Sequence, residues 1–160
     1  MRETFPILIN YTQVCVYLSD RADADLLWTD EHVAQGFSWV PGNVAFGVPD
    51  HDGECWMEIN IAANVSDVRA ETSSWAIEVP FDVGTSEVRI GTLFNDKRFD
   101  LPRGPYRLIF EAHPGQTRNG IPYAYLLRVL LMSDHQQNFL ILKQGELASG
   151  IVLATPKSPP

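Results

Sequence analysis

Cysteine is scarce in this chain of 160 residues, which contains only Cys15 and Cys55. Two cysteines do not make a disulfide framework, and no cysteine or histidine pair has the spacing of a zinc site. We therefore expect free thiols in a reducing, cytoplasmic setting and no structural metal.

Long apolar runs are also missing. The strongest one, residues 123–132, is interrupted by Arg128 and is too short for a membrane helix, which needs roughly 18 apolar residues. The N-terminal sequence has no uninterrupted apolar segment followed by small residues. The sequence therefore predicts neither a membrane span nor a signal peptide.

Sequence motifs of known catalytic sites are absent. There is no GxSxG, no glycine-rich phosphate loop and no HExxH. The densest group of potential metal ligands is residues 51–55, HDGEC, but Gly53 makes a turn the preferred interpretation. We predict that the chain is not an enzyme and has no catalytic residues, no metal and no cofactor. An enzyme of unknown chemistry remains an alternative, because catalytic groups can assemble from distant positions.

Basic residues are nearly absent from the first 58 residues. This stretch holds ten acids but only Arg2 and Arg21, so it carries the whole net charge of −8, while the remainder is neutral. The asymmetry argues against direct nucleic-acid binding, which needs clustered lysine and arginine, and favours a basic protein as partner. Solubility is the alternative explanation for the acidic charge. No feature of the sequence specifies an oligomeric state.

Short segments rich in β-branched and aromatic residues, separated by turn residues, dominate the chain. The segments predicted as strands are residues 7–18, 43–48, 54–61, 75–81, 88–93, 97–101, 104–112, 139–142 and 151–153. Residues 123–132 fit a central strand or a buried helix, and Pro122 with the neighbouring tyrosines favours the strand. The pattern predicts an all-β protein, an antiparallel β-sandwich with one short α-helix.

Prolines and turn residues add detail to this prediction. Pro80 cannot donate a ladder hydrogen bond, so its strand should lie at an edge or an end near it. Asn95 and Asp96 are predicted as the turn between two strands. We expect one domain over residues 1–155 and a disordered tail at 156–160, which is rich in proline.

The single predicted helix begins after Thr29. Thr29 is a suitable N-cap and Gly36 suits the left-handed position at the C-terminal end. Trp28 can pack on Val33 in the manner of a hydrophobic staple. In a β domain such a helix would cover an open end of the sandwich.

Two groups of acids are candidates for a partner-binding surface. The helix-proximal acids precede or begin the helix, where Asp30 and Glu31 also suit the helix dipole. The loop acids follow Pro49, and we prefer them because Pro49 and Gly53 already make the turn, which leaves the carboxylates without a folding role. The helix-proximal acids are Asp20, Asp23, Asp25, Asp30 and Glu31, and the loop acids are Asp50, Asp52 and Glu54.

Tryptophan supplies the aromatic candidates. Trp56 and Trp75 lie on predicted strands and are expected in the core, whereas Trp39 is expected to be exposed beside the helix. An exposed Trp39 could anchor a protein interface. The four tryptophans, which include Trp28, could also form a flat platform for a sugar, so a carbohydrate-binding module that uses Trp39 and its neighbours is the alternative function.

Three segments of the chain resemble the competence protein J family. Residues 28–48, WTDEHVAQGFSWVPGNVAFGV, carry the first part, and residues 79–83, VPFDV, the second. The clearest part is FDLPRGPYRL at residues 99–108, where the family has a similar run of FDLP, a basic residue, Gly, any residue and Tyr. The ordered segments span about residues 10–131, and residues 133–160 extend beyond the family's usual end.

The resemblance implies a small acidic protein that binds a basic bacterial DNA nuclease and blocks it. Such an inhibitor would offer carboxylates where the phosphates of DNA would otherwise sit. The nuclease could serve DNA uptake, or it could be an antibacterial toxin for which this chain is the antidote. The resemblance implies no particular set of interface residues.

Overall fold

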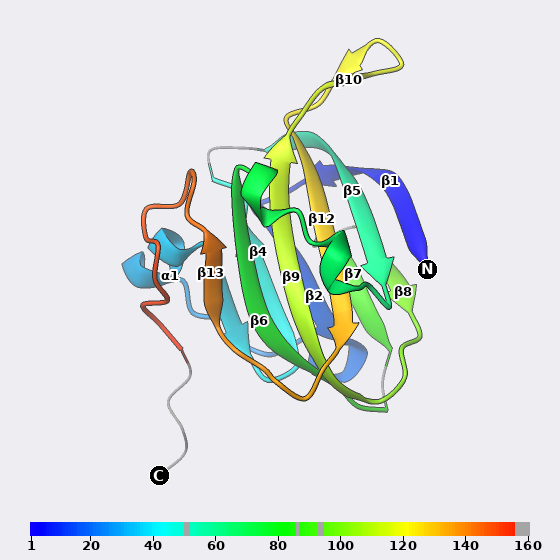
Figure 1. Ribbon diagram of the computed structural model, residues 1–160, viewed down its shortest axis with the longest axis vertical. Coiled ribbons are helices and arrows are strands. Elements are labelled where there is room, and N and C mark those ends of the chain that lie inside the picture. The colour runs from blue at the N-terminus through cyan, green and yellow to red at the C-terminus, as the bar shows by residue number, and fades with distance from the viewer. Residues whose placement is uncertain (50–51, 86, 93–94, 156–160) are drawn as a thin grey trace.

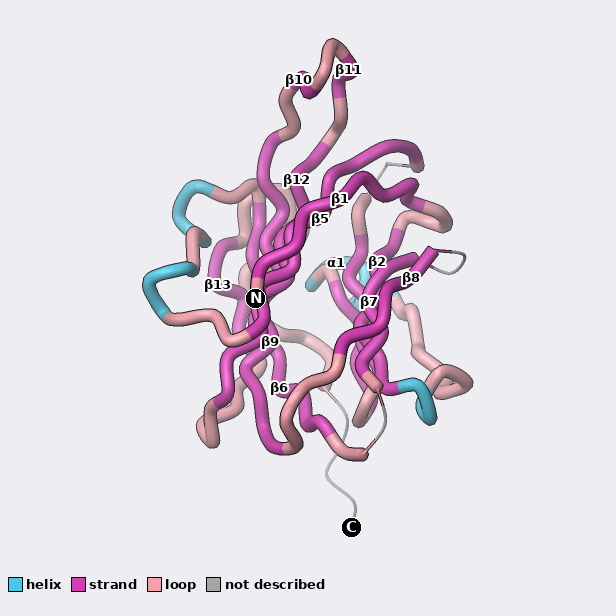
Figure 2. Tube along the Cα trace, turned by 90° about the vertical axis from the view of Figure 1, so that its right-hand side faces the viewer, coloured by secondary structure: helices cyan, strands magenta, loops and turns pink. Residues whose placement is uncertain are grey.

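The computed structural model describes residues 1–49, 52–85, 87–92 and 95–155. Two packed β-sheets account for most of the described chain (Figures 1 and 2). Sheet A contains, in spatial order, β1 (Arg2–Ile9), β5 (Gly53–Ile61), β12 (Tyr125–Ser133), β9 (Gly104–Pro114), β6 (Trp75–Val83) and β13 (Leu140–Lys143). Sheet B contains β3 (Phe37–Val40), β4 (Asn43–Gly47), β2 (Gln13–Leu18), β7 (Val88–Thr92) and β8 (Asn95–Phe99).

The predicted β-sandwich is confirmed, and Figure 2 shows its two layers from the side. All strand pairs are antiparallel except β5 with β12, which run parallel at the centre of sheet A. A small hairpin of β10 (Thr117–Arg118) and β11 (Ile121–Pro122) projects beyond the sandwich (Figure 2). Residues 123–132 do contain the predicted strand rather than a helix.

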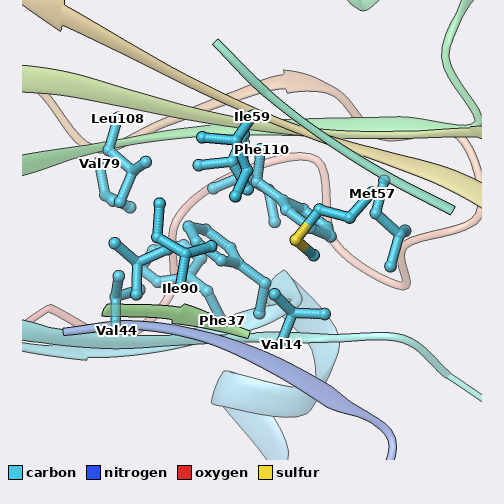
Figure 3. Packing of buried hydrophobic residues seen from close by; sticks show 14 of the residues in the cluster. Val14, Phe37, Val44, Met57, Ile59, Val79, Ile90, Leu108 and Phe110 are labelled. Atoms are coloured by element: carbon cyan, nitrogen blue, oxygen red, sulfur yellow. The ribbon is translucent and has the colours of Figure 1, made fainter. Parts of the chain in front are cut away.

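The core lies between the two sheets, because alternate residues of each strand point inward (Figure 3). The predicted alternation of β5 is confirmed, since Cys55, Met57 and Ile59 are buried. Phe46 of sheet B stacks on Phe110 of sheet A with ring centroids 4.6 Å apart. Such contacts between opposite strands fix how the sheets face one another.

The predicted strand over residues 7–18 is instead two strands in different sheets. β1 belongs to sheet A and β2 to sheet B. The chain reverses at Tyr11 and Thr12, whose φ angles are +58° and +53°. Neither residue is a usual turn former, so the run of β-branched and aromatic residues conceals the turn.

Three smaller predictions also need correction or refinement. Asn95 and Asp96 are the first residues of β8 and pair with β7, while residues 93–94, between the two strands, lie outside the described residues. Residues 151–153 form no strand. Strand β6 lies between β9 and β13 in sheet A, but β13 pairs only with Ala76, Ile77 and Glu78. Pro80 therefore lies in the part of β6 that pairs with a strand on one side only, as predicted. The predicted tail at residues 156–160 lies outside the described part of the chain.

The predicted helix is confirmed as α1 (Asp30–Gln35). Thr29 is its N-cap, and the hydroxyl of Thr29 accepts a hydrogen bond from the backbone N–H of His32 at 3.4 Å. His32 returns the interaction, because its Nδ1 accepts from the backbone N–H of Thr29 at 3.2 Å. Gly36 ends the helix at φ +85°, as glycine readily does.

Residues 133–155 add a strand and a cover to the sandwich. β13 extends sheet A beyond β6, and Phe139 packs against Phe37 and Trp39 with centroid distances of 6.3 and 5.1 Å. Leu147 is buried, and the backbone N–H of Ser149 donates to the carbonyl of Ala34 in α1 at 2.9 Å. Figure 1 shows this segment, in orange and red, beside α1.

Gln35 joins α1 to the end of this cover. Its side-chain amide is fully buried and donates to the carbonyls of Phe37 and Ala154 at 2.9 and 3.0 Å. Its Oε1 accepts from the backbone N–H groups of Leu153 and Ala154, both at 2.9 Å. One side chain thereby satisfies four backbone groups.

Replacement of this amide should release the end of the cover. Gln35→Leu removes all four hydrogen bonds, and each buried group left unpaired costs about 1–3 kcal/mol. We expect residues 149–155 to detach, because their backbone groups can then bond to water. Limited proteolysis with mass spectrometry should show new cleavage in that segment. Gln144→Leu, which removes a single, partly buried hydrogen bond from the side-chain amide to the carbonyl of Leu147, is the control. Wild-type protection of residues 149–155 in Gln35→Leu would contradict the assigned role.

Candidate functional site

The helix-proximal acids lie on an exposed segment that leads into α1. Asp23 and Asp25 are exposed and form no ion pair with any basic residue that the structure describes. Asp30 and Glu31 occupy the first turn of α1. The pKa of Glu31 lies below its ordinary value, because its own backbone N–H and the Thr29 hydroxyl bond to the carboxylate. Glu31 therefore has the structural role predicted for it, whereas Asp23 and Asp25 are available to a partner.

The loop acids do not form the single cluster that the sequence suggested. Asp50 lies outside the described residues. Asp52 has a folding role, since its Oδ1 accepts from the backbone N–H of Thr12 at 3.0 Å. Glu54 belongs to β5 and is opposite Leu8, on the outer side of sheet A. The expectation of carboxylates without a folding role is wrong for Asp52, because the β1–β2 turn packs against it.

Trp39 is not the exposed anchor that we expected. It is half-buried, its Nε1 donates to the carbonyl of Pro80 at 2.7 Å, and Phe139 packs against its ring. The covering residues come from the C-terminal part of the chain, which local sequence could not indicate. Trp28 is the most exposed tryptophan, at 37%.

The four tryptophans share no common face. Trp75 is buried as predicted, but Trp56 lies on the outer side of sheet A with the Arg118 guanidinium 4.0 Å above its ring. Trp39 is covered and Trp28 lies beside α1. This arrangement gives no flat platform of tryptophans for a sugar.

A groove of about 450 Å³ lies between the β1–β2 turn and α1. We call it the α1 groove. Tyr11 and Val33, on its two sides, are 65% and 58% exposed. Gly47 lies next to the Trp28 ring, because a Cβ at Gly47 would be in ordinary van der Waals contact with that ring at 3.8 Å. The lining residues are Tyr11, Thr12, Gln13, Trp28, Val33, Gly36, Gly47, Val48 and Pro49.

Members of both predicted acidic groups belong to the segments that form the α1 groove. Asp52 accepts a hydrogen bond from the backbone of Thr12, which lines the groove. Asp30 and Glu31 belong to α1, the helix that contributes Val33 to the lining. The sequence presented these groups as alternatives, but Asp52 from one and Asp30 and Glu31 from the other lie on elements that form the same groove. Sequence reasoning missed Tyr11, because the turn that contains it carries no sequence signal of a turn.

A second cluster of charges is buried on the outer side of sheet A. Arg128 is 1% exposed and donates to Glu58 at 2.7 Å, to Glu111, and to the carbonyl of Asp67 at 3.0 Å. The segment with the turns η2 (Val65–Asp67) and η3 (Ala70–Thr72) covers this cluster (Figure 1). Every nitrogen of the guanidinium has a partner, which indicates a structural role.

Neither thiol has the character of a nucleophile. Cys15 and Cys55 are free, and burial raises the pKa of each to about 11. Both are therefore protonated near neutral pH. Among the described residues, no three histidine, cysteine, aspartate or glutamate side chains form a metal-binding group. None of the helices in the described ranges has the length and apolarity to cross a membrane.

Comparison with known proteins places the fold. The crystal structure of ComJ from Bacillus subtilis, an inhibitor of the DNA-degrading activity of NucA, matches with a TM-score of 0.69 at 20% sequence identity. The match covers 82% of this chain and 96% of that chain, so the two proteins share a fold. No curated protein matches by sequence. The model of the competence protein J family matches residues 6–132, which is most of the chain. This chain belongs to the competence protein J family.

Proposed function

We propose that this chain binds a bacterial DNA-degrading nuclease and blocks it, without catalytic activity of its own. Membership of the competence protein J family carries the proposal, and the shared fold with an inhibitor of NucA supports it. The acidic exposed side chains add a physical reason, because a nuclease must present basic residues to phosphate. The exposed carboxylates of Asp23 and Asp25 can form ion pairs with such residues and thereby exclude DNA.

The proposal includes the character of the partner and of the complex. The nuclease is basic, the inhibitor itself does not bind DNA, and inhibition is stoichiometric. We further propose a cytoplasmic location, which the two free thiols support. A nuclease of DNA uptake and an antibacterial nuclease both fit the same surface chemistry.

Capture of nuclease activity tests this function directly. The immobilised chain should remove DNA-degrading activity from a lysate of its own organism. The eluted nuclease should digest linear double-stranded DNA until an equimolar amount of the chain is added back. The chain alone should neither cut DNA nor retard it in a gel, and the heat-denatured chain is the control. Unchanged digestion in the presence of excess folded chain would refute the function.

A further inference from the structure

The turn between β1 and β2 is built from residues that suit it poorly. Tyr11 and Thr12 both have positive φ angles, and Asn10 and Gln13 on either side form an isolated bridge. A two-residue turn with two positive φ angles favours Asn-Gly. Each non-glycine residue in this region costs on the order of 1–3 kcal/mol, and a β-branched residue is especially unusual there.

The chain contains the favourable version of the same turn elsewhere. Asn119 and Gly120 have φ angles of +51° and +78° and join β10 to β11. The same geometry is therefore made with two different residue pairs in one protein. The strained residue pair at the β1–β2 turn therefore points to a role for the side chains of Tyr11 and Thr12.

Contacts with a neighbouring segment hold the strained turn in place. The backbone N–H of Thr12 donates to Asp52 at 3.0 Å, and its carbonyl accepts from the N–H of Val48 at 2.8 Å. Both are backbone contacts of residue 12, so they hold the turn whatever side chains it carries.

Tyr11 lines the α1 groove together with Trp28 and Val33. All three are substantially exposed, and exposed aromatic residues around a concave apolar surface are typical of interface anchors. Carboxylates lie on both sides, at Asp52 and in the first turn of α1. An occupant of this groove must therefore be apolar at its centre and basic at its edges.

We propose that the α1 groove receives an apolar side chain of the nuclease that is flanked by lysine or arginine, and that Tyr11 is the main anchor on this chain. The inference rests on the proposed function and adds to it the surface and the chemistry of the contact. The two backbone contacts of residue 12 hold the turn, and with it Tyr11, at the groove before the partner arrives, which lowers the ordering cost of binding.

A swap of turn residues separates binding from folding. Tyr11→Asn with Thr12→Gly installs the favoured pair and keeps both backbone contacts of residue 12. The thermal unfolding midpoint should stay at or above that of wild type. The inhibition constant, measured with the captured nuclease on linear DNA, should rise by about 30-fold or more, as expected for loss of an interface anchor.

The matched control is the reverse swap, Asn119→Tyr with Gly120→Thr, at the β10–β11 turn. It should lower the unfolding midpoint and leave the inhibition constant within about twofold of wild type. Val33→Asp, a change at an exposed position on the other side of the groove, should raise the inhibition constant without a change at the turn. This second variant tests the groove even if the first folds poorly.

The outcomes are distinct. Wild-type inhibition by a folded Tyr11→Asn, Thr12→Gly variant, or by Val33→Asp, would overturn the groove and leave the inhibitor function intact. Failure of the wild-type chain to inhibit any captured nuclease would overturn the function and the groove together. Loss of inhibition in both groove variants, with the reverse swap active, supports the proposal.

Discussion

Arg128→Leu should lower the free energy of unfolding by about 3–5 kcal/mol, because it leaves the buried carboxylate of Glu111 without its guanidinium partner. Glu111 is fully buried and bonds to Arg128, while Glu58 at 2.7 Å loses the same guanidinium. Domains of this kind are stable by only about 5–15 kcal/mol, so the loss is a large fraction of the total. Urea unfolding followed by tryptophan fluorescence measures it.

Two further variants identify the cause of that loss. Arg128→Leu combined with Glu111→Gln removes the stranded charge and keeps an acceptor for the Arg69 backbone N–H, so it should recover part of the stability. Arg98→Leu breaks an exposed ion pair with Glu87 at 3.8 Å and should cost no more than about 1 kcal/mol. Equal losses in Arg128→Leu and Arg98→Leu would show that burial of the charge is unimportant.

The same cluster gives stability a defined dependence on pH. Burial raises the pKa of Glu111, but hydrogen bonds from His113, the Arg69 backbone and Arg128 outweigh it, and the net pKa lies below the ordinary 4.5. A carboxyl with a lowered pKa in the folded state stabilises the fold above its unfolded pKa. That stability is lost as pH falls below about 4.5 and through the folded pKa.

Local sequence patterns predicted those parts of the fold that local chemistry decides. Thr29 and Gly36 delimit α1 because an N-cap and a left-handed glycine act within a few residues. The alternation around Met57 identified a strand with one buried side. Arg128, which interrupts an apolar run, could not be interpreted from sequence, because its partners Glu58 and Glu111 come from neighbouring strands.

The candidate site was harder to predict, because contacts between distant residues create it. The bond from Thr12 to Asp52 joins positions 40 residues apart and turns a free carboxylate into a structural one. Phe139 and Pro80 cover Trp39 from other parts of the chain. A turn made by Tyr11 and Thr12 carries no sequence signal of a turn, although it forms one wall of the groove.

Reversal of the two free helix-proximal acids should slow binding to the nuclease. Each of Asp23→Lys and Asp25→Lys adds two positive charges, so the double variant changes the net charge from −8 to −4. Electrostatic attraction raises association rates by roughly 10- to 1,000-fold at low salt. We expect the association rate at low salt to fall about tenfold or more, while the dissociation rate changes less. Stopped-flow or surface binding measurements with the captured nuclease give both rates.

Salt and a matched control show whether the location of the charge matters. The Debye length shrinks from about 10 Å at 0.1 M salt to about 3 Å at 1 M, so the variant and wild type should converge at high salt. Glu71→Lys with Asp100→Lys changes the net charge equally, at two exposed positions that do not line the α1 groove. Because the field of a protein acts most strongly near its source, this control should retain most of the wild-type rate. Equal slowing by both double variants would mean that net charge alone attracts the nuclease. Slowing confined to Asp23 and Asp25 would place the approach of the nuclease on the segment that leads into α1.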